Sequence, residues 1–183
     1  ISGEQRPVVA AALAREKEEE APSAAIELPD GRLITGGTSD LLGAASAVLL
    51  NALKCLAGIA HRIRVISPAS IEPIQHLKTE YLGSKNPRLH TDELLIALSA
   101  SASGNPTASE AMRQLPKLSG CQMHTSVILS SVDVRTLKSL GIQLTMEPRF
   151  ENKRRYHCRP AAAIWNRHCC LRQPQTPAVC KVR

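Results

Sequence analysis

Two apolar runs separated by a short polar turn predict a β-hairpin at residues 24–35. Two short apolar runs, residues 24–28 and 32–35, flank Pro29-Asp30-Gly31. Proline, aspartate and glycine in succession favour a tight turn, so the two runs are expected to pair as neighbouring strands.

A long helix, apolar on nearly every side, is expected directly after the hairpin. Its N-cap is predicted to be Thr38, Ser39 or Asp40, because short polar side chains satisfy the first N–H groups of a helix. Its end is predicted near Gly58, since glycine favours helix termination. A helix without a polar face must be buried, so it should lie at the centre of the core.

The rest of the pattern predicts alternating elements that complete a layered domain. In chain order these are a short buried strand at 63–66, an amphipathic helix at 70–82, a helix capped by Thr91 that runs to about Ser101, a helix from Asn105-Pro106 to about Leu115, a strand at 123–129, a helix at 133–140 and a strand at 142–146. This order predicts the α/β class, as a layered α/β/α domain with a small mixed sheet. We assign residues 1–23 to the end of a preceding helical region, 24–150 to the domain, and 151–183 to an irregular, basic, cysteine-rich tail.

The formal net charge of +7 is confined to that tail. Residues 1–150 contain 15 Lys or Arg and 15 Asp or Glu, whereas residues 151–183 contain eight basic residues and one acid. Aromatic side chains, which would stack on bases, make up only 2% of the chain. Nucleic acid is therefore not expected as a partner.

Cysteine use and hydropathy favour a cytoplasmic protein with no membrane partner. Only Cys55 and Cys121 lie in residues 1–150, too few for a disulfide framework. The most apolar segment, residues 41–59, is interrupted by polar residues and fits a buried helix better than a bilayer span. The first residue, Ile1, is not an initiator methionine, so we expect a fragment of a longer protein.

A phosphate-loop-like spacing, G-x-x-x-x-G-K-[ST], covers residues 31–38 with one departure. Gly31, Gly36 and Thr38 are correctly spaced, but Gly37 stands where the lysine is required. One interpretation is an anion site formed by Gly36, Thr38 and Ser39. The other is a hairpin turn at Gly31 followed by a flexible helix entry at Gly36-Gly37.

Histidine and carboxylate residues gather around two predicted helices. The candidates for acid/base chemistry or a divalent metal are His76, Glu80, His90, Asp92 and Glu93, and Lys85 and Arg88 beside them are candidates for an acidic ligand. The alternative interpretation is helix capping, with His90 hydrogen-bonded to backbone and Lys85 and Arg88 on a loop surface.

No standard metal or nucleophile motif supports a stronger assignment. The histidines and cysteines of the tail do not have the spacing of zinc hooks, and residues 1–150 contain no G-x-S-x-G, no H-E-x-x-H and no plausible Cys–His pair. We therefore expect no metal and no cofactor, and a peptidase acting through this fragment alone is disfavoured.

Residues 8–150 resemble the C-terminal part of the bacterial family called domain of unknown function 1846. The resemblance is carried by residues 25–32 (AIELPDGR), 38–44 (TSDLLGA), 71–83 (IEPIQHLKTEYLG), 86–93 (NPRLHTDE) and 114–118 (QLPKL). It implies a cytoplasmic, multidomain protein whose N-terminal α/β domain is absent here.

The same resemblance implies further expectations about fold and tail. Family members usually have lysine where this chain has Gly37, and some carry an ATP-dependent peptidase label. The family's last subdomain resembles the topology of cytidine deaminases, but this chain lacks their zinc signature, so fold alone carries over. Nothing in the family resembles residues 151–183, and our hypothesis is that they are a frameshift product or another non-native extension.

Two functions follow as hypotheses. The first is a structural and interaction domain, which completes a homo-oligomer or covers a site on the absent N-terminal domain. The second is a part of a nucleotide- or phosphate-dependent enzyme that uses Thr38, Ser39, His90 and Asp92.

Overall fold

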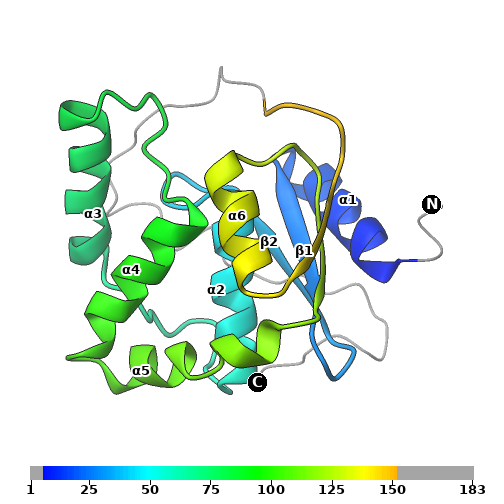
Figure 1. The fold of residues 1–183 in the computed structure, drawn as a ribbon, viewed down its shortest axis with the longest axis horizontal. Helices are drawn as coiled ribbons and strands as arrows, with labels where there is room; N and C mark the ends of the chain where they lie inside the picture. Colours follow the sequence, from blue (N-terminus) through cyan, green and yellow to red (C-terminus); the bar gives the residue numbers. More distant parts are fainter. Residues whose placement is uncertain (1–5, 152–183) are drawn as a thin grey trace.

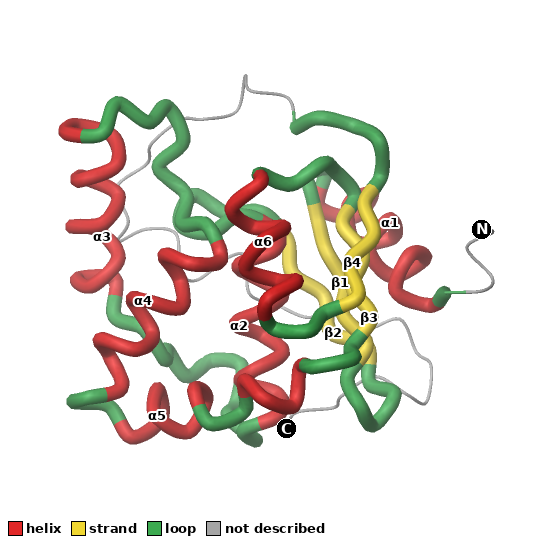
Figure 2. The backbone as a smooth tube through the Cα atoms, viewed as in Figure 1, coloured by secondary structure: helices red, strands yellow, loops and turns green. Residues whose placement is uncertain are grey.

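A four-stranded mixed sheet forms the centre of the computed structural model, which describes residues 6–151 (Figures 1 and 2). The strands are β1 (Ser23–Glu27), β2 (Leu33–Gly37), β3 (Gln122–Thr125) and β4 (Gln143–Met146), in the spatial order β2-β1-β3-β4. β1 is antiparallel to β2 and β3, and β3 is parallel to β4. The predicted α/β class and small mixed sheet are confirmed.

The β1–β2 hairpin forms where the sequence predicts it. Gly31 has a φ of +79°, a conformation that glycine adopts without the steric penalty of a side chain, and its N–H donates to Leu28 O. The carboxylate of Asp30 accepts hydrogen bonds from the backbone N–H and the side chain of Arg32. These local bonds fix the register in which Ile26 lies opposite Ile34.

Helices cover both faces of the sheet. α1 (Pro7–Glu19) packs on one face, and α2 (Ala44–Leu56) packs on the other (Figure 2). On the α2 side, α6 (Ser131–Ser139) contacts β4 and α4 (Thr91–Ala102), and α5 (Pro106–Met112) packs against α2 and α4. α3 (Pro68–His76) lies furthest from the sheet (Figure 1). Leu49 and Leu53 of α2 are almost completely buried, which confirms that this helix is central to the core.

The predicted N-cap of α2 is wrong. The helix begins at Ala44 after Gly43, because Thr38 and Ser39 are engaged elsewhere. Both the N–H and the hydroxyl of Thr38 donate to Pro22 O, and the Ser39 hydroxyl accepts from the N–H groups of Leu41 and Leu42. Serine and threonine stabilise such local turns as readily as they cap helices.

Residues 63–66, predicted as a buried strand, form bends instead. Val65 and Ile66 are buried as expected, but Ile63 is 42% exposed. None of the four strands of residues 6–151 includes this segment, and the Val65 carbonyl accepts from the Asn105 side chain. A short apolar run shows that a segment is buried without specifying its backbone conformation.

The predicted helix at 70–82 consists of two parts. α3 is capped by the Ser67 hydroxyl, which accepts from Ala69 N, and it continues into a π-helical turn, η2 (Leu77–Tyr81). A short 3₁₀ helix, η3 (Leu115–Leu118), follows α5. The predictions for residues 1–5 and 152–183 concern parts of the chain outside the described residues.

Candidate functional site

The N-termini of α4 and α6 meet at the carboxylate of Asp133. This carboxylate accepts from His90 Nδ1 at 2.8 Å, from the Thr91 N–H at 2.8 Å and from the Ser130 hydroxyl at 2.7 Å. Ser130 is the N-cap of α6, and its oxygen accepts from the Asp133 N–H. Asp133 therefore ties the first turn of α4 to the first turn of α6, where a negative charge is favoured by both helix dipoles.

Hydrogen bonds and opposite charges at this point favour the ionised forms of both partners, and burial opposes them. Burial is the largest influence on Asp133 and raises its pKa, but hydrogen bonds from His90, Ser130 and Thr91 outweigh burial, so the pKa lies below its ordinary value. The hydrogen bond to Asp133 raises the pKa of His90, against an opposing effect of burial. A protonated His90 beside an ionised Asp133 is stabilised as a result.

The His90 imidazole is oriented through one nitrogen. Nδ1 contacts Asp133, whereas no hydrogen bond within residues 6–151 involves Nε2, and the side chain is 29% exposed. A histidine held by a carboxylate in this way can donate or accept a proton through its other nitrogen.

Ser130, His90 and Asp133 do not form a nucleophilic triad. In such a triad the histidine contacts the serine with one ring nitrogen and the carboxylate with the other. Here the Ser130 hydroxyl and the Asp133 carboxylate both lie at Nδ1, at 3.4 and 2.8 Å. The hydroxyl donates to Asp133 and not to the imidazole, so His90 is not placed to take the Ser130 proton as the histidine of a triad does.

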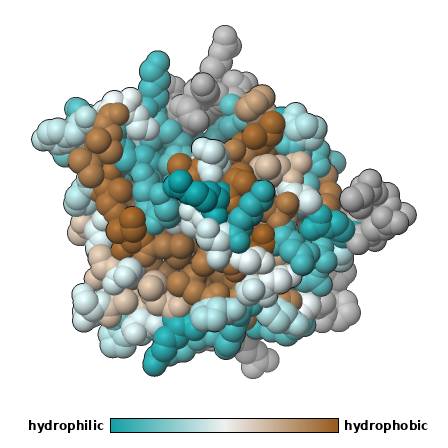
Figure 3. Space-filling model, viewed as in Figure 1, coloured by the Kyte–Doolittle hydropathy of each residue, from teal (hydrophilic) through white to brown (hydrophobic). Residues whose placement is uncertain are grey.

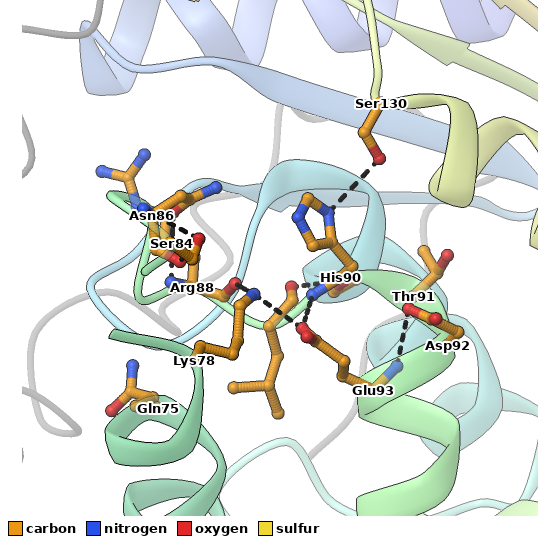
Figure 4. A network of polar contacts seen from close by, with 12 residues as sticks. Gln75, Lys78, Ser84, Asn86, Arg88, His90, Thr91, Asp92, Glu93 and Ser130 are labelled. Atoms are coloured by element: carbon orange, nitrogen blue, oxygen red, sulfur yellow. Dashed lines mark hydrogen bonds and ion pairs between the residues drawn. The ribbon is translucent and has the colours of Figure 1, made fainter. Parts of the chain in front are cut away.

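Lys78, Glu93 and the His90 backbone form the second half of the cluster (Figure 4). Glu93 Oε2 accepts from the His90 N–H at 2.8 Å and from Lys78 Nζ at 2.7 Å, and Lys78 Nζ also donates to Arg88 O at 2.5 Å. Glu93 thus completes a capping box for α4. The predicted cap Thr91 is wrong by one residue: His90 is the N-cap and Thr91 begins the helix.

Other predicted residues lie around this cluster with local roles. Asp92 accepts from the Glu93 N–H, and Arg88 is buried, with its guanidinium paired with Glu151. Lys85 is exposed on the loop. His76 is exposed at the end of α3 and packs edge-to-face against Tyr81, so the structure does not join it to His90.

The phosphate-loop-like residues do not form a loop that leads into a helix. Gly36 and Gly37 belong to β2, so the predicted flexible helix entry is wrong. A Cβ at Gly36 would lie 2.3 Å from Val48 N, so glycine allows β2 to approach α2 closely. A Cβ at Gly37 would lie 1.9 Å from Glu19 Oε2.

The described residues contain neither a metal-binding cluster nor a membrane-spanning helix. No group of three or more His, Cys, Asp or Glu side chains among residues 6–151 is arranged to hold a metal ion. Within the same range, every helix is too short or too polar to cross a membrane.

Comparison with known proteins gives the family. Residues 4–156 match the family model described as "Domain of unknown function DUF1846, C-terminal". The chain belongs to this family. A UPF0371 protein of Corynebacterium glutamicum (strain R) is 55% identical over 156 residues, which are 85% of this chain and 32% of that relative. UPF0371 protein stu1377 of Streptococcus thermophilus (strain ATCC BAA-250 / LMG 18311) is 43% identical over 156 residues, with the same shares of each chain.

The chain therefore spans about a third of the length of the curated relatives it matches. In these DUF1846 relatives, about two thirds of the polypeptide lies outside the matched region. The resemblance found in the sequence is confirmed, and a further part of the protein is expected to accompany the domain described here.

Three members of the cluster were not predicted from the sequence as site residues: Lys78, Ser130 and Asp133. The spacing Ser130-x-x-Asp133 is that of a helix cap, and it was the available signal for α6. Lys78 follows Ile71 and Ile74 on the inward side of its helix, a position where a charge requires a buried partner.

Proposed function

We propose that this DUF1846 region is a structural and interaction domain of a longer cytoplasmic protein. The observation that carries the proposal is a group of large hydrophobic side chains left in contact with solvent on η2, the residue after it and α4. These are Leu77 (49% exposed), Tyr81 (74%), Leu82 (70%) and Ile96 (65%). Clustered apolar surface of this kind is typical of sites that bind another protein surface.

The polar cluster at His90 supports the same proposal. Its carboxylates accept hydrogen bonds from helix N-termini and from neighbouring side chains, which is the bonding expected of groups that join helices. The proposed partners are the remaining two thirds of the longer protein and further copies of it. Nucleic acid is not a proposed partner.

A dye that fluoresces on apolar surfaces tests whether this surface is accessible. The folded chain is expected to enhance the dye's fluorescence, and Leu77→Ser combined with Leu82→Ser should remove about half of the enhancement. Ile63→Ser, another exposed apolar residue on a different segment, is the control and should change it little. A chain that remains monomeric on a sizing column and leaves the dye dark would contradict the proposal.

A second candidate, an acid/base or phosphate-binding element of a nucleotide-dependent enzyme, rests on the orientation of His90. Its Nε2 makes no hydrogen bond within residues 6–151, while Nδ1 is held by Asp133. Calorimetry of the full-length protein with ATP and with sugar phosphates tests this candidate. Binding that His90→Gln weakens, or that Gly37→Lys strengthens, would support it, and the absence of any heat would remove it.

A further inference from the structure

The outer side of α3 and η2 forms a ridge with two stripes. Pro73, Leu77 and Tyr81 are all exposed and four residues apart, and beside them lies the exposed polar series Glu72, His76 and Glu80. We call the apolar stripe with Leu82 the α3–η2 ridge. Residues four apart on a helix lie on one side of it, so the apolar members form a continuous line.

The inner side of the same segment is fixed by a buried charge. Lys78 is 5% exposed and its Nζ donates to Glu93 and to Arg88 O, which ties η2 to α4 and to the loop before it. The π-helical turn is closed by the Leu82 N–H, which donates to Leu77 O at 3.0 Å. Such turns are rare and occur frequently at functional sites. Here the turn directs Lys78 inward while Leu77 and Tyr81 remain outside.

The apolar surface extends beyond the ridge onto α4. Figure 3 shows hydrophobic side chains that follow α3 and continue over α4, the helix that carries exposed Ile96. A tyrosine at such a surface supplies a large contact area and a hydroxyl, the combination enriched at the energetic centres of interfaces.

The ridge faces away from the point where the preceding polypeptide joins. α1 lies on the opposite side of the molecule from α3 in Figure 1. In the longer relatives, the preceding part is therefore attached on the α1 side, which leaves the ridge directed outward. This arrangement favours a separate molecule as the occupant.

We propose that the α3–η2 ridge, together with Ile96, is a two-fold interface that binds the same surface of a second copy of this chain. The proposal rests on the interaction function above and names its partner. A two-fold interface brings one patch against itself, so charges of both signs on its rim can pair with their opposites on the second copy. Glu80 and Lys85 are both exposed and flank Tyr81 and Leu82. Antiparallel pairing of two ridges would bring each Glu80 near the partner's Lys85.

Sedimentation or light scattering over a concentration series tests the interface on this chain and on the full-length protein. A dimer is expected in both, and Leu77→Ser with Tyr81→Ser should raise its dissociation constant by about 30-fold or more, as loss of a central interface residue does. Ile63→Ser should leave the dissociation constant unchanged. Because all three side chains are exposed, an unchanged far-ultraviolet circular dichroism spectrum will confirm that the variants are folded, and the variant that loses the dimer should melt at a lower temperature.

A charge exchange tests the pairing itself. Glu80→Lys and Lys85→Glu should each weaken the dimer, and the double variant should recover it, because the exchange restores opposite charges across the interface. Additive weakening in the double variant would contradict antiparallel pairing of the ridges.

The failure of this proposal can be told apart from failure of the interaction function. The full-length protein could prove to be a monomer whose ridge is protected from hydrogen exchange and does not enhance the fluorescence of the dye. This result would show that the preceding part of the polypeptide covers the ridge. That result would contradict the dimer interface proposed here, and it would support the proposed interaction function. A monomer with an unprotected ridge in both proteins overturns both.

Discussion

The two faces of the central sheet bury different kinds of side chain. Toward α2 point Ile26, Ile34 and Met123, all nearly inaccessible, which join the main hydrophobic core. Toward α1 the opposing positions are Ala25, His124 and Thr145. A strand alternates its side chains between faces, so a one-residue difference in position separates a large apolar layer from a small, polar one.

Polar contacts hold α1 where large apolar side chains are lacking. Arg6, the residue before α1, donates to Gln122 and to Thr145, and Arg149 pairs with Glu16. Exposed ion pairs and single hydrogen bonds contribute about 1 kcal/mol or less each, whereas a buried leucine or isoleucine contributes about 1.5–3 kcal/mol. From the kinds of side chain buried, we expect the sheet to be anchored mainly to α2, with α1 as the weaker layer although it contacts three of the strands.

Matched valine truncations test this difference most strongly. Val48 in α2 and Val8 in α1 are both fully buried. Val48→Ala is expected to lower the free energy of unfolding by about 2–3 kcal/mol, because the dense core cannot collapse into the cavity. Val8→Ala should cost about 1 kcal/mol, since few large side chains surround it. Equal losses in urea denaturation would mean that the two layers are equally well packed.

Adjacent glycines of β2 sharpen the same contrast. A methyl group at Gly36 would meet the α2 backbone at Ala47 and Val48, so Gly36→Ala should destabilise the protein by about 1–3 kcal/mol. A methyl group at Gly37 would meet the end of the Glu19 side chain, which pairs with Arg15 but can shift, and Gly37→Ala should cost about 1 kcal/mol or less. Thermal melts of both variants measure the difference, and the reverse ranking would refute it.

Asp133 tests whether a polar cluster also matters on the α2 side. Asp133→Asn keeps the side-chain size but removes the charge that two helix N-termini and His90 share. The expected loss is about 1–2 kcal/mol. Asp92→Asn is the control, because its one hydrogen bond is local and half-exposed, and it should change stability by less than about 0.5 kcal/mol. Similar losses in the two variants would contradict the linking role of Asp133.

His90, which is partly exposed, and His124, which is buried, should respond to pH with opposite signs. The pKa of His90 is raised, mainly by Asp133, so this group contributes stability below the unfolded pKa of about 6.5 that is lost as pH rises through the folded pKa. Burial lowers the pKa of His124, so its contribution is present above about 6.5 and is lost as pH falls through its folded pKa.

Unfolding of two variants between pH 7.5 and 5 measures these contributions. Relative to the wild-type protein, His90→Gln should become progressively less stable as the pH falls. His124→Gln should move the other way and lose its disadvantage at low pH. Parallel pH profiles for the two variants would show that the histidines on the two sides of the sheet do not differ in this respect.

Local signals in the sequence were sufficient for the hairpin, for the central position of α2 and for most helices. Each depends on residues close in the chain, such as the turn at Asp30-Gly31 or the all-apolar run of α2. The strand predicted at residues 63–66 was wrong, because the burial of Val65 and Ile66 does not require a paired neighbouring strand.

The candidate site was predictable only in part. His90, Asp92 and Glu93 are adjacent in sequence, and their capping role was among the interpretations. Asp133 lies 43 residues from His90, and only the packing of α6 against α4 brings the two together. Lys78 lies in a segment whose amphipathic pattern predicts only a helix. The pattern does not reveal Glu93 and the Arg88 carbonyl, the partners that allow the Lys78 charge to be buried.

The weak attachment of α1 has a consequence for how the protein opens. Partial unfolding proceeds first through units with few buried apolar contacts, so α1 should detach from the sheet at a lower free energy than the sheet needs to separate from α2. Since α1 is also the connection to whatever precedes it in the longer relatives, this detachment would act as a hinge. The two parts of the polypeptide could then change their relative orientation while the sheet, α2 and the α3–η2 ridge remain intact.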